Sequence, residues 1–295
     1  MVSRVLWPIL VALSGLVLLA GCDTNTPDPP PERGPLRRLT YPLNPTSNSG
    51  ILPDGVRGTV TIWEISSQTS IVTLALDNGP TGTDDAHVAY LRENEAATGG
   101  DILFRLTPIN GQQGEGTSAR LVNASFDSLA ALDGHVTLHE RLASLETVIA
   151  QGDIGANANG TPGEGFDLPP RPRGIDYSLT AQVNGGPFPT GVSGRVLFQE
   201  LSPRQTLATL ELRLSGATGA DVSHPAFIRE NTVAEGGPIV LSLAPIDGSD
   251  PAVRSSQILE TPIDSLVVFN GHVTVEQSVA VDTVLARGNI GGNAN

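Results

Sequence analysis

The chain has 295 residues, with 31 acidic residues against 17 basic ones and a formal net charge of −14. Such an acidic surface repels nucleic acid and anionic lipid headgroups, so we expect neither to be held through charge. All 17 basic residues are arginine, and without lysine a Schiff base, a Walker-type phosphate loop and a Ser-Lys dyad are excluded. Because a Gly-x-Ser-x-Gly motif is also missing, the sequence predicts a protein that is not an enzyme.

Residues 1–21 are predicted to be a secretory signal. Arg4 precedes an apolar run from Leu6 to Ala20, which is shorter than the roughly 20 residues of a membrane span. The run ends in Leu19-Ala-Gly-Cys22, which resembles a bacterial lipoprotein signal, where the cysteine is joined to diacylglycerol and the chain is cut before it. An ordinary signal peptide is the alternative, but the only cysteine of the chain stands where lipidation requires it. We therefore expect Cys22 to anchor the protein to a membrane, which leaves no thiol for a disulfide.

Residues 22–40 are predicted to be an extended tether. The segment from Thr24 to Arg38 is rich in proline and poor in apolar residues, so it is not expected to join a hydrophobic core. At about 3.1 Å per residue, such a polyproline-like segment reaches on the order of 45 Å. It would hold a folded domain clear of the lipid headgroups.

The rest of the sequence is a tandem repeat. Residues 41–159 align with residues 177–295 almost without gaps, and both copies end alike, in Asp153-Ile-Gly-Ala-Asn-Ala-Asn159 and Asn289-Ile-Gly-Gly-Asn-Ala-Asn295. Each copy has the size of a domain that buries its own core. Residues 160–176, rich in proline and glycine, are expected to link the two domains.

Apolar residues within each copy alternate with a period of two, which is typical of strands with one buried face. Strands are expected at residues 56–62, 72–76, 86–91, 102–106, 135–138 and 147–150, and in the second copy at 192–198 and 208–212. Only residues 127–132 have a helical pattern. Many short strands separated by glycine-rich turns predict an all-β fold of two tandem antiparallel β-sandwiches.

Four motifs follow one another in both copies, in the same order and at nearly the same spacing. They are His87-Val-Ala-Tyr-Leu-Arg-Glu-Asn94 with His224-Pro-Ala-Phe-Ile-Arg-Glu-Asn231, Pro108-Ile-Asn-Gly111 with Pro245-Ile-Asp-Gly248, Leu132-Asp-Gly-His-Val-Thr-Leu138 with Phe269-Asn-Gly-His-Val-Thr-Val275, and Gln151-Gly-Asp-Ile-Gly155 with Arg287-Gly-Asn-Ile-Gly291. This succession resembles the CHRD domain, a family named from chordin, over nearly the whole of both copies. The resemblance implies immunoglobulin-like sandwiches, loosely similar to the copper/zinc superoxide dismutase barrel, in bacterial lipoproteins of unknown role.

The resemblance also implies a metal site that this chain does not reproduce. CHRD domains commonly carry a His-x-His pair and a third histidine on a later strand, and these imidazoles together could hold a metal. The positions of the pair are occupied by Tyr90 and Arg92 in the first copy and by Phe227 and Arg229 in the second, while His139 stands opposite Glu276 at the third. Because arginine does not ligate a cation, we expect no dismutase-like metal centre and no cofactor.

The remaining candidate residues are the other histidines and a charged triplet. His87 pairs with His224 and His135 with His272. A structural role beside a strand and a weak metal or pH-sensitive contact, which would include His139, both stay open. The triplet Arg92-Glu93-Asn94 recurs as Arg229-Glu230-Asn231. It is either a recognition surface or an Arg-Glu pair that closes its own loop, and we take its six residues as candidate binding residues.

Taken as a whole, the sequence predicts a lipid-anchored protein of the bacterial cell envelope, facing the periplasm or the cell surface. Its two modules are expected to bind a protein or polysaccharide partner, or to serve a structural role in the envelope. The rival hypothesis is an enzyme, either a metal-dependent, dismutase-like redox protein or a hydrolase that uses Asp and His. A third is a pair of spacer modules without a ligand.

Overall fold

The structure is a computed structural model that describes residues 35–46, 54–77, 81, 86–111, 116–182, 192–214, 222–250, 253–278 and 281–294. The predicted signal peptide, Cys22 and the tether up to residue 34 lie outside the described residues. The chain from Pro35 to Asn295 forms one compact unit.

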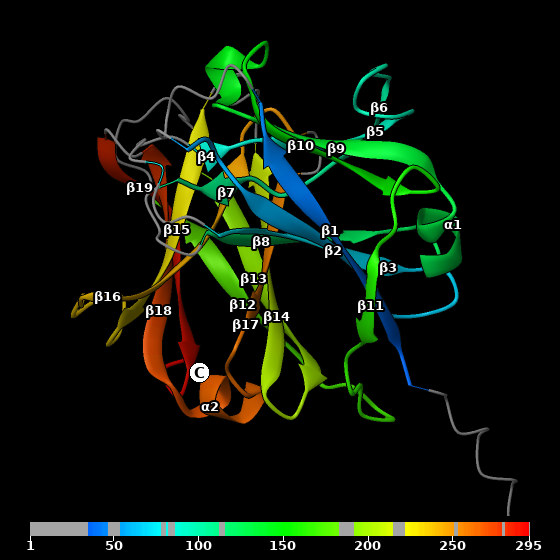
Figure 1. The fold of residues 1–295 in the computed structure, drawn as a ribbon. Helices are drawn as coiled ribbons and strands as arrows, with labels where there is room; N and C mark the ends of the chain where they lie inside the picture. The colour runs from blue at the N-terminus through cyan, green and yellow to red at the C-terminus, as the bar shows by residue number, and fades with distance from the viewer. Residues whose placement is uncertain are drawn as a thin grey trace, which may run out of the picture. The chain divides into compact units, whose positions relative to one another are not determined.

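The first repeat consists almost entirely of strands (Figure 1). Its elements are β1 (Arg37–Pro45), β2 (Gly58–Glu64), β3 (Ser70–Leu76), β4 (Ala86–His87), β5 (Ala89–Glu93), β6 (Ile102–Arg105), β7 (Ile109–Asn110), β8 (Thr117–Val122), α1 (Phe126–Ala130), β9 (Asp133–His139), a 3-10 helix (Leu142–Ser144) and β10 (Val148–Gly155). A short strand, β11 (Thr161–Glu164), follows in the segment between the repeats.

The second repeat follows the same order of elements. They are β12 (Gly174–Ala181), β13 (Val192–Ser202), β14 (Gln205–Leu214), β15 (Ser223–Glu230), β16 (Ile239–Asp247), β17 (Arg254–Leu259), α2 (Ile263–Val268), β18 (Asn270–Ser278) and β19 (Val281–Gly291). The predicted all-β fold is confirmed.

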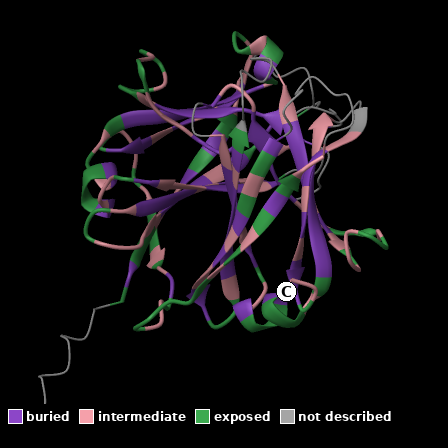
Figure 2. Ribbon diagram, turned by 180° about the vertical axis from the view of Figure 1, so that it is seen from behind, coloured by how far each residue is buried: buried purple, intermediate pink, exposed green. Residues whose placement is uncertain are grey.

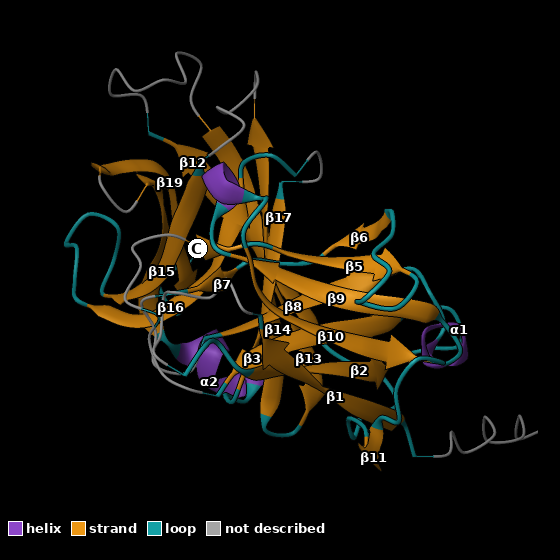
Figure 3. Ribbon diagram, turned by 45° about the horizontal axis from the view of Figure 1, so that its top comes forward, coloured by secondary structure: helices purple, strands orange, loops and turns teal. Residues whose placement is uncertain are grey.

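The strands form one shared sheet and two outer sheets (Figure 3), apart from β4 and β7, which pair with each other in a separate two-stranded sheet. Neighbouring strands of the shared sheet are antiparallel and lie in the order β11, β1, β2, β3, β8, β17, β14, β13, β12. The first repeat adds an outer sheet of order β1, β10, β9, β5, β6. The second adds one of order β12, β19, β18, β15, β16. Strands β1 and β12 therefore each take part in two sheets.

Each repeat buries a hydrophobic core between its part of the shared sheet and its outer sheet (Figure 2). In the first repeat, Val60 and Leu74 of the shared sheet join Leu91 and Val136 of the outer sheet in one fully buried cluster. These residues follow the period of two seen in the sequence, because successive side chains of a strand point to opposite faces. The second repeat has the equivalent core.

The structure differs from the sequence expectations at strands β1, β8, β11 and β17. Strand β8 and its counterpart β17 follow no alternating pattern, because side chains on both of their faces are buried. Strand β1 begins at Arg37, within the expected tether, and β11 lies in the expected linker, where it pairs with β1. Both segments therefore extend the shared sheet.

The two repeats meet where β8 pairs with β17 at Ala119 and Ser256. These two residues are equivalent in the repeat: β3 pairs with β8 in the same register as β14 pairs with β17, so Ser118 corresponds to Ser255 and Ala119 to Ser256. Each strand thus faces its own counterpart in the antiparallel direction, as in the interface of a twofold-symmetric dimer. We call this junction the seam.

A third hydrophobic cluster lies along the seam. It contains Ile71 from the first repeat, Leu201 and Leu207 from the second, and Phe166 from the connecting segment. Ile71 and Leu207 are equivalent residues, and both are almost completely buried. Because Ile71 alternates along β3 with residues of the first core, it lies on the opposite face of the shared sheet. The repeats therefore cover each other's second apolar face.

Candidate functional site

The asparagine of the charged triplet fixes a turn. Asn94 and Asn231 end β5 and β15 in the left-handed backbone region, with φ of 61° and 64°. Asparagine tolerates this region because its short side chain bonds locally, and Nδ2 of Asn94 donates to the Gly99 carbonyl at 3.0 Å. Its main-chain N–H donates to the Asp133 carbonyl at 2.9 Å. The second copy repeats both bonds.

The arginine of the triplet bonds across to the neighbouring strand. Arg92 donates from Nε to Thr137 Oγ1 at 3.2 Å and from Nη1 to the Gly100 carbonyl at 3.0 Å. Arg229 repeats this pattern and adds an ion pair of 2.9 Å with Glu276. The neighbouring Glu93 and Glu230 are exposed. Of the six candidate binding residues, these two glutamates and Asn94 are exposed, while both arginines and Asn231 are half-buried.

The paired histidines also bond to main-chain carbonyls. Nδ1 of His135 lies 2.8 Å from the carbonyl of Asn94, and His272 lies 2.9 Å from that of Asn231. In each repeat, the imidazole on β9 or β18 therefore bonds to the turn that the asparagine forms. His87, which is fully buried, lies 2.6 Å through Nδ1 from the Glu140 carbonyl, and His224 makes the equivalent contact.

The positions that the CHRD resemblance assigns to metal ligands do lie close together. The Tyr90 and His139 rings meet edge to face, with centroids 5.3 Å apart. The guanidinium of Arg92 lies 5.4 Å from the Tyr90 centroid, and Thr137 Oγ1 bonds both Arg92 and His139. A permanent cation thus occupies this place. Among the described residues, no three His, Cys, Asp or Glu side chains come together in a way that could hold a metal ion.

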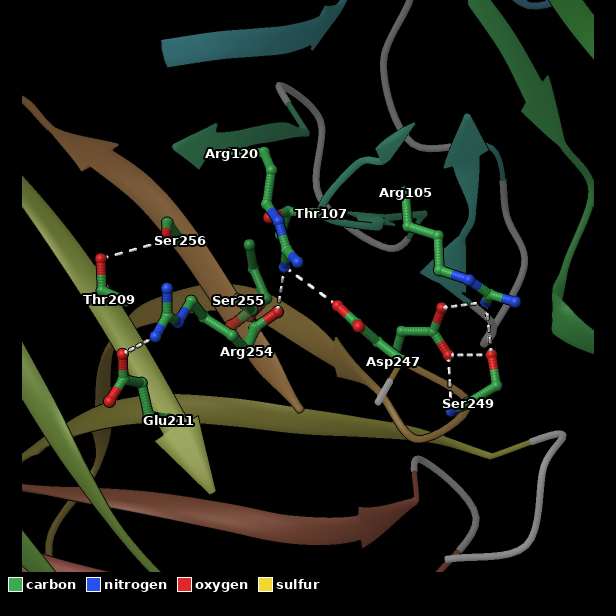
Figure 4. A network of polar contacts seen from close by, with 12 residues as sticks. Arg105, Thr107, Arg120, Thr209, Glu211, Asp247, Ser249, Arg254, Ser255 and Ser256 are labelled. Carbon is green, nitrogen blue, oxygen red and sulfur yellow. Dashed lines mark hydrogen bonds and ion pairs between the residues drawn. The ribbon is translucent and has the colours of Figure 1, made fainter. Parts of the chain in front are cut away.

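One side of the seam is filled by ion pairs between the repeats (Figure 4). Nη1 of Arg120 lies 3.0 Å from Asp250 Oδ2, and Nη1 of Arg105 lies 3.6 Å from Asp247 Oδ2. The two carboxylate side chains are only 8% and 5% exposed. Arg120 also donates to the Arg254 carbonyl at 3.1 Å. The first repeat supplies the arginines and the second repeat the carboxylates.

Glu211 continues this network within the second repeat. Its carboxylate pairs with Arg254 and lies 2.6 Å from Nη2 of Arg195. Burial alone would raise the pKa of Glu211, but the hydrogen bond from Arg195 and the charge of Arg254 lower it below its ordinary value. The charged side of the seam comprises Arg105, Arg120, Glu211, Asp247, Asp250 and Arg254.

The seam also borders a cleft of about 560 Å³. Its walls come from β1, β2, β3 and β8 of the first repeat and from β14, β16, β17 and the turn after β17 of the second. Polar side chains in the lining are Thr73, Thr117, Ser118, Gln205, Gln257, Glu260 and Thr261, beside Arg38 and Trp63. We call this space the inter-repeat cleft.

Sequence reasoning missed both the charged side of the seam and the inter-repeat cleft, because it searched for residues that the copies share. The available signal was the difference between the copies. Arg120 corresponds to the neutral Gln257, and Asp247 corresponds to the neutral Asn110. The first repeat therefore carries a cation, and the second an anion, at positions where the other copy is uncharged. Complementary charges of this kind indicate two surfaces that meet.

Comparison with known proteins identifies no family for this chain. No protein-family model, curated protein or solved structure gives a significant match. The resemblance to CHRD domains therefore stays a prediction. In the described part of the chain, no helix has the length and apolar character needed to cross a membrane.

Removing one partner of a buried inter-repeat ion pair should destabilise the whole unit. We expect Arg120→Gln to lower the free energy of unfolding by about 2–4 kcal/mol, because it leaves Asp250 buried without this cation. The double variant Arg120→Gln/Asp250→Asn should lose less than the single variant, since the buried negative charge of Asp250 is removed as well. Urea denaturation followed by circular dichroism measures both. A double variant as unstable as the sum of the two single variants would show that the residues do not interact.

His139 should make stability depend on pH in the weakly acidic range. Its burial lowers the pKa from 6.5 to about 4, so the folded protein holds the imidazole neutral. As the pH falls from about 6.5 to about 4, the unfolded chain takes up the proton first, and stability drops by about 3 kcal/mol. The loss should be smaller in His139→Gln, in which the carboxylates still titrate. An unchanged difference in unfolding free energy between the two proteins over this range would contradict the assignment.

Proposed function

We propose that the chain is a lipid-anchored, non-enzymatic protein of the bacterial cell envelope that binds an extracytoplasmic partner in the inter-repeat cleft. The cleft is the observation that carries this proposal, since strands of both repeats line a space of about 560 Å³. Concave sites of a few hundred Å³ with apolar walls and a few polar groups are typical of ligand binding. The net charge of −14 argues against nucleic acid as the partner.

The residues shared by the repeats support a role without catalysis. The histidine and asparagine that both copies retain bond to main-chain groups of one turn. Side chains used in this way hold a scaffold together and are not poised for proton transfer. The metal-dependent alternative has less support, because Arg92 and Arg229 bring a positive charge to the positions where the family would bind a cation.

Attachment through Cys22 is the part of the proposal that rests on sequence alone. We expect the wild-type protein to enter the detergent phase on Triton X-114 partitioning and Cys22→Ser to stay in the aqueous phase, because the diacylglycerol would be lost. Thr24→Ser, two residues further on, is the matched control and should behave like wild type. A Cys22→Ser protein that still enters the detergent phase would rule out this anchor.

Trp63 offers a direct test of binding. The only other tryptophan, Trp7, lies in the predicted signal peptide, so fluorescence of the processed protein would report on the cleft alone. We expect soluble fractions of the cell envelope to shift the Trp63 emission in a saturable way. Thr117→Arg, which fills the cleft, should remove the shift. If no fraction changes the emission of the wild-type protein, the binding function is wrong.

A further inference from the structure

The inter-repeat cleft exists because the two repeats differ at the positions beside the seam. On β14 and β17, Glu211 and Arg254 are cross-strand partners and form an ion pair. On β3 and β8 of the first repeat, the equivalent partners are Ala75 and Thr117. These short side chains leave open a space that the long charged ones fill on the other side.

A third pair of equivalent residues, Arg120 and Gln257, also differs in a way that leaves the cleft open. The side chain of Arg120 reaches across the seam to the Arg254 carbonyl and to Asp250. Its equivalent is Gln257, which is shorter and uncharged, and which donates from Nε2 to Thr117 Oγ1 at 3.2 Å. Glu211, Arg254 and Arg120 of the charged side thus have neutral counterparts in the cleft. The pseudo-twofold relation between the repeats predicts a second ion network at the position of the cleft. The residues found there are shorter and neutral, and they leave a space.

The cleft also has an unsatisfied acceptor. Gln257 is 8% exposed, and its Oε1 is buried without a hydrogen-bond donor. A buried carbonyl oxygen without a donor is unfavourable, and on the charged side the equivalent residue has its polar contacts. A ligand hydroxyl placed against Gln257 would supply the missing donor.

The chemistry of the walls narrows the class of ligand. The hydroxyls of Thr73 and Thr117 and the amide of Gln257 can both donate and accept, which matches sugar hydroxyls better than an ion of one sign. Arg38 and Glu260 in the lining cancel each other's charge. The chain as a whole carries a charge of −14, which disfavours an anionic ligand.

An aromatic ring is held rigidly in the same wall. The Trp63 indole stacks on Phe166 with centroids 4.3 Å apart, and its Nε1 donates to Thr73 Oγ1 at 3.0 Å. The equivalent residue of the second repeat is Gln199. The Arg38 guanidinium lies 5.1 Å from the indole centroid, so the C–H groups of a sugar would pack against the part of the rigid ring that Phe166 and Arg38 leave open, at little cost in side-chain entropy.

We propose that the inter-repeat cleft binds a neutral saccharide, a class of ligand that deepens and rests on the binding function proposed above. Sugar hydroxyls would bond to Thr117 and Gln257, in the space that Arg254 and Glu211 fill on the charged side. The C–H faces of the sugar would pack against the apolar wall that includes Trp63 and Ile258. An acidic polysaccharide would add negative charge to a protein that already carries −14.

The test titrates the purified processed protein, which lacks Trp7, with three panels of probes while following Trp63 emission. The panels are neutral oligosaccharides (glucans, mannans, xylans and chito-oligosaccharides), acidic oligosaccharides, and unstructured peptides. We expect saturable shifts from at least one neutral oligosaccharide. Thr117→Arg should weaken its binding at least about tenfold by occupying the space, and Gln257→Leu about tenfold by removing the amide. Thr180→Arg, the same change at an exposed position of β12, should bind within about twofold of wild type.

The outcomes separate the saccharide from the binding function itself. Peptides or acidic oligosaccharides that bind in place of neutral ones, and lose binding in Thr117→Arg, would overturn the ligand class and leave the binding function standing. A neutral oligosaccharide that binds Thr117→Arg as well as wild type would overturn the site. No shift from any probe or envelope fraction would overturn both. Circular dichroism and thermal melting show whether each variant is folded. If Thr117→Arg does not fold, Gln257→Leu still tests the site.

Discussion

The pairing of β8 with β17 is the constraint on which the rest of the structure depends. A repeat alone would expose one of these strands as an open edge, with unpaired main-chain groups and an apolar face beside it. Joining equivalent strands at Ala119 and Ser256 covers both edges at once. It also buries Ile71 against Leu207. Because one chain carries both copies, the effective concentration of each for the other is high, and the pairing needs no second molecule.

Sequence reasoning found the strands in which apolar residues recur at every second position. Strands β2 and β3 place such residues in the core of their own repeat, and the period of two remains visible although Ile71 is buried on the other face of β3. It missed β8 and β17, because their second face is buried by the other repeat, which no local pattern records. Strand β11 was missed for the same reason: it is a strand because it pairs with β1, and its own residues show no strand pattern.

The internal comparison of the two copies was informative for the scaffold and misleading for the site. Residues retained in both copies have a structural role within each copy. Asn94 forms a turn with positive φ, and His135 bonds to the main-chain carbonyl of that turn. Among the described residues, the charged side of the seam has no such space, so the residues of the inter-repeat cleft have no reason to be the same in both copies. Ala75 and Glu211 differ because they stand on opposite sides of the seam.

Because the repeats differ in charge beside the seam, its two sides have different roles. With arginines on the first repeat and carboxylates on the second, the charged side favours one pairing and opposes contact between two identical repeats, where like charges would meet. Its buried ion pairs thus specify orientation as much as they add stability. Once that side fixes the register, the other side no longer needs long side chains to hold the repeats together. Short neutral residues such as Ala75 and Thr117 are then sufficient, and the space they leave is open to a ligand.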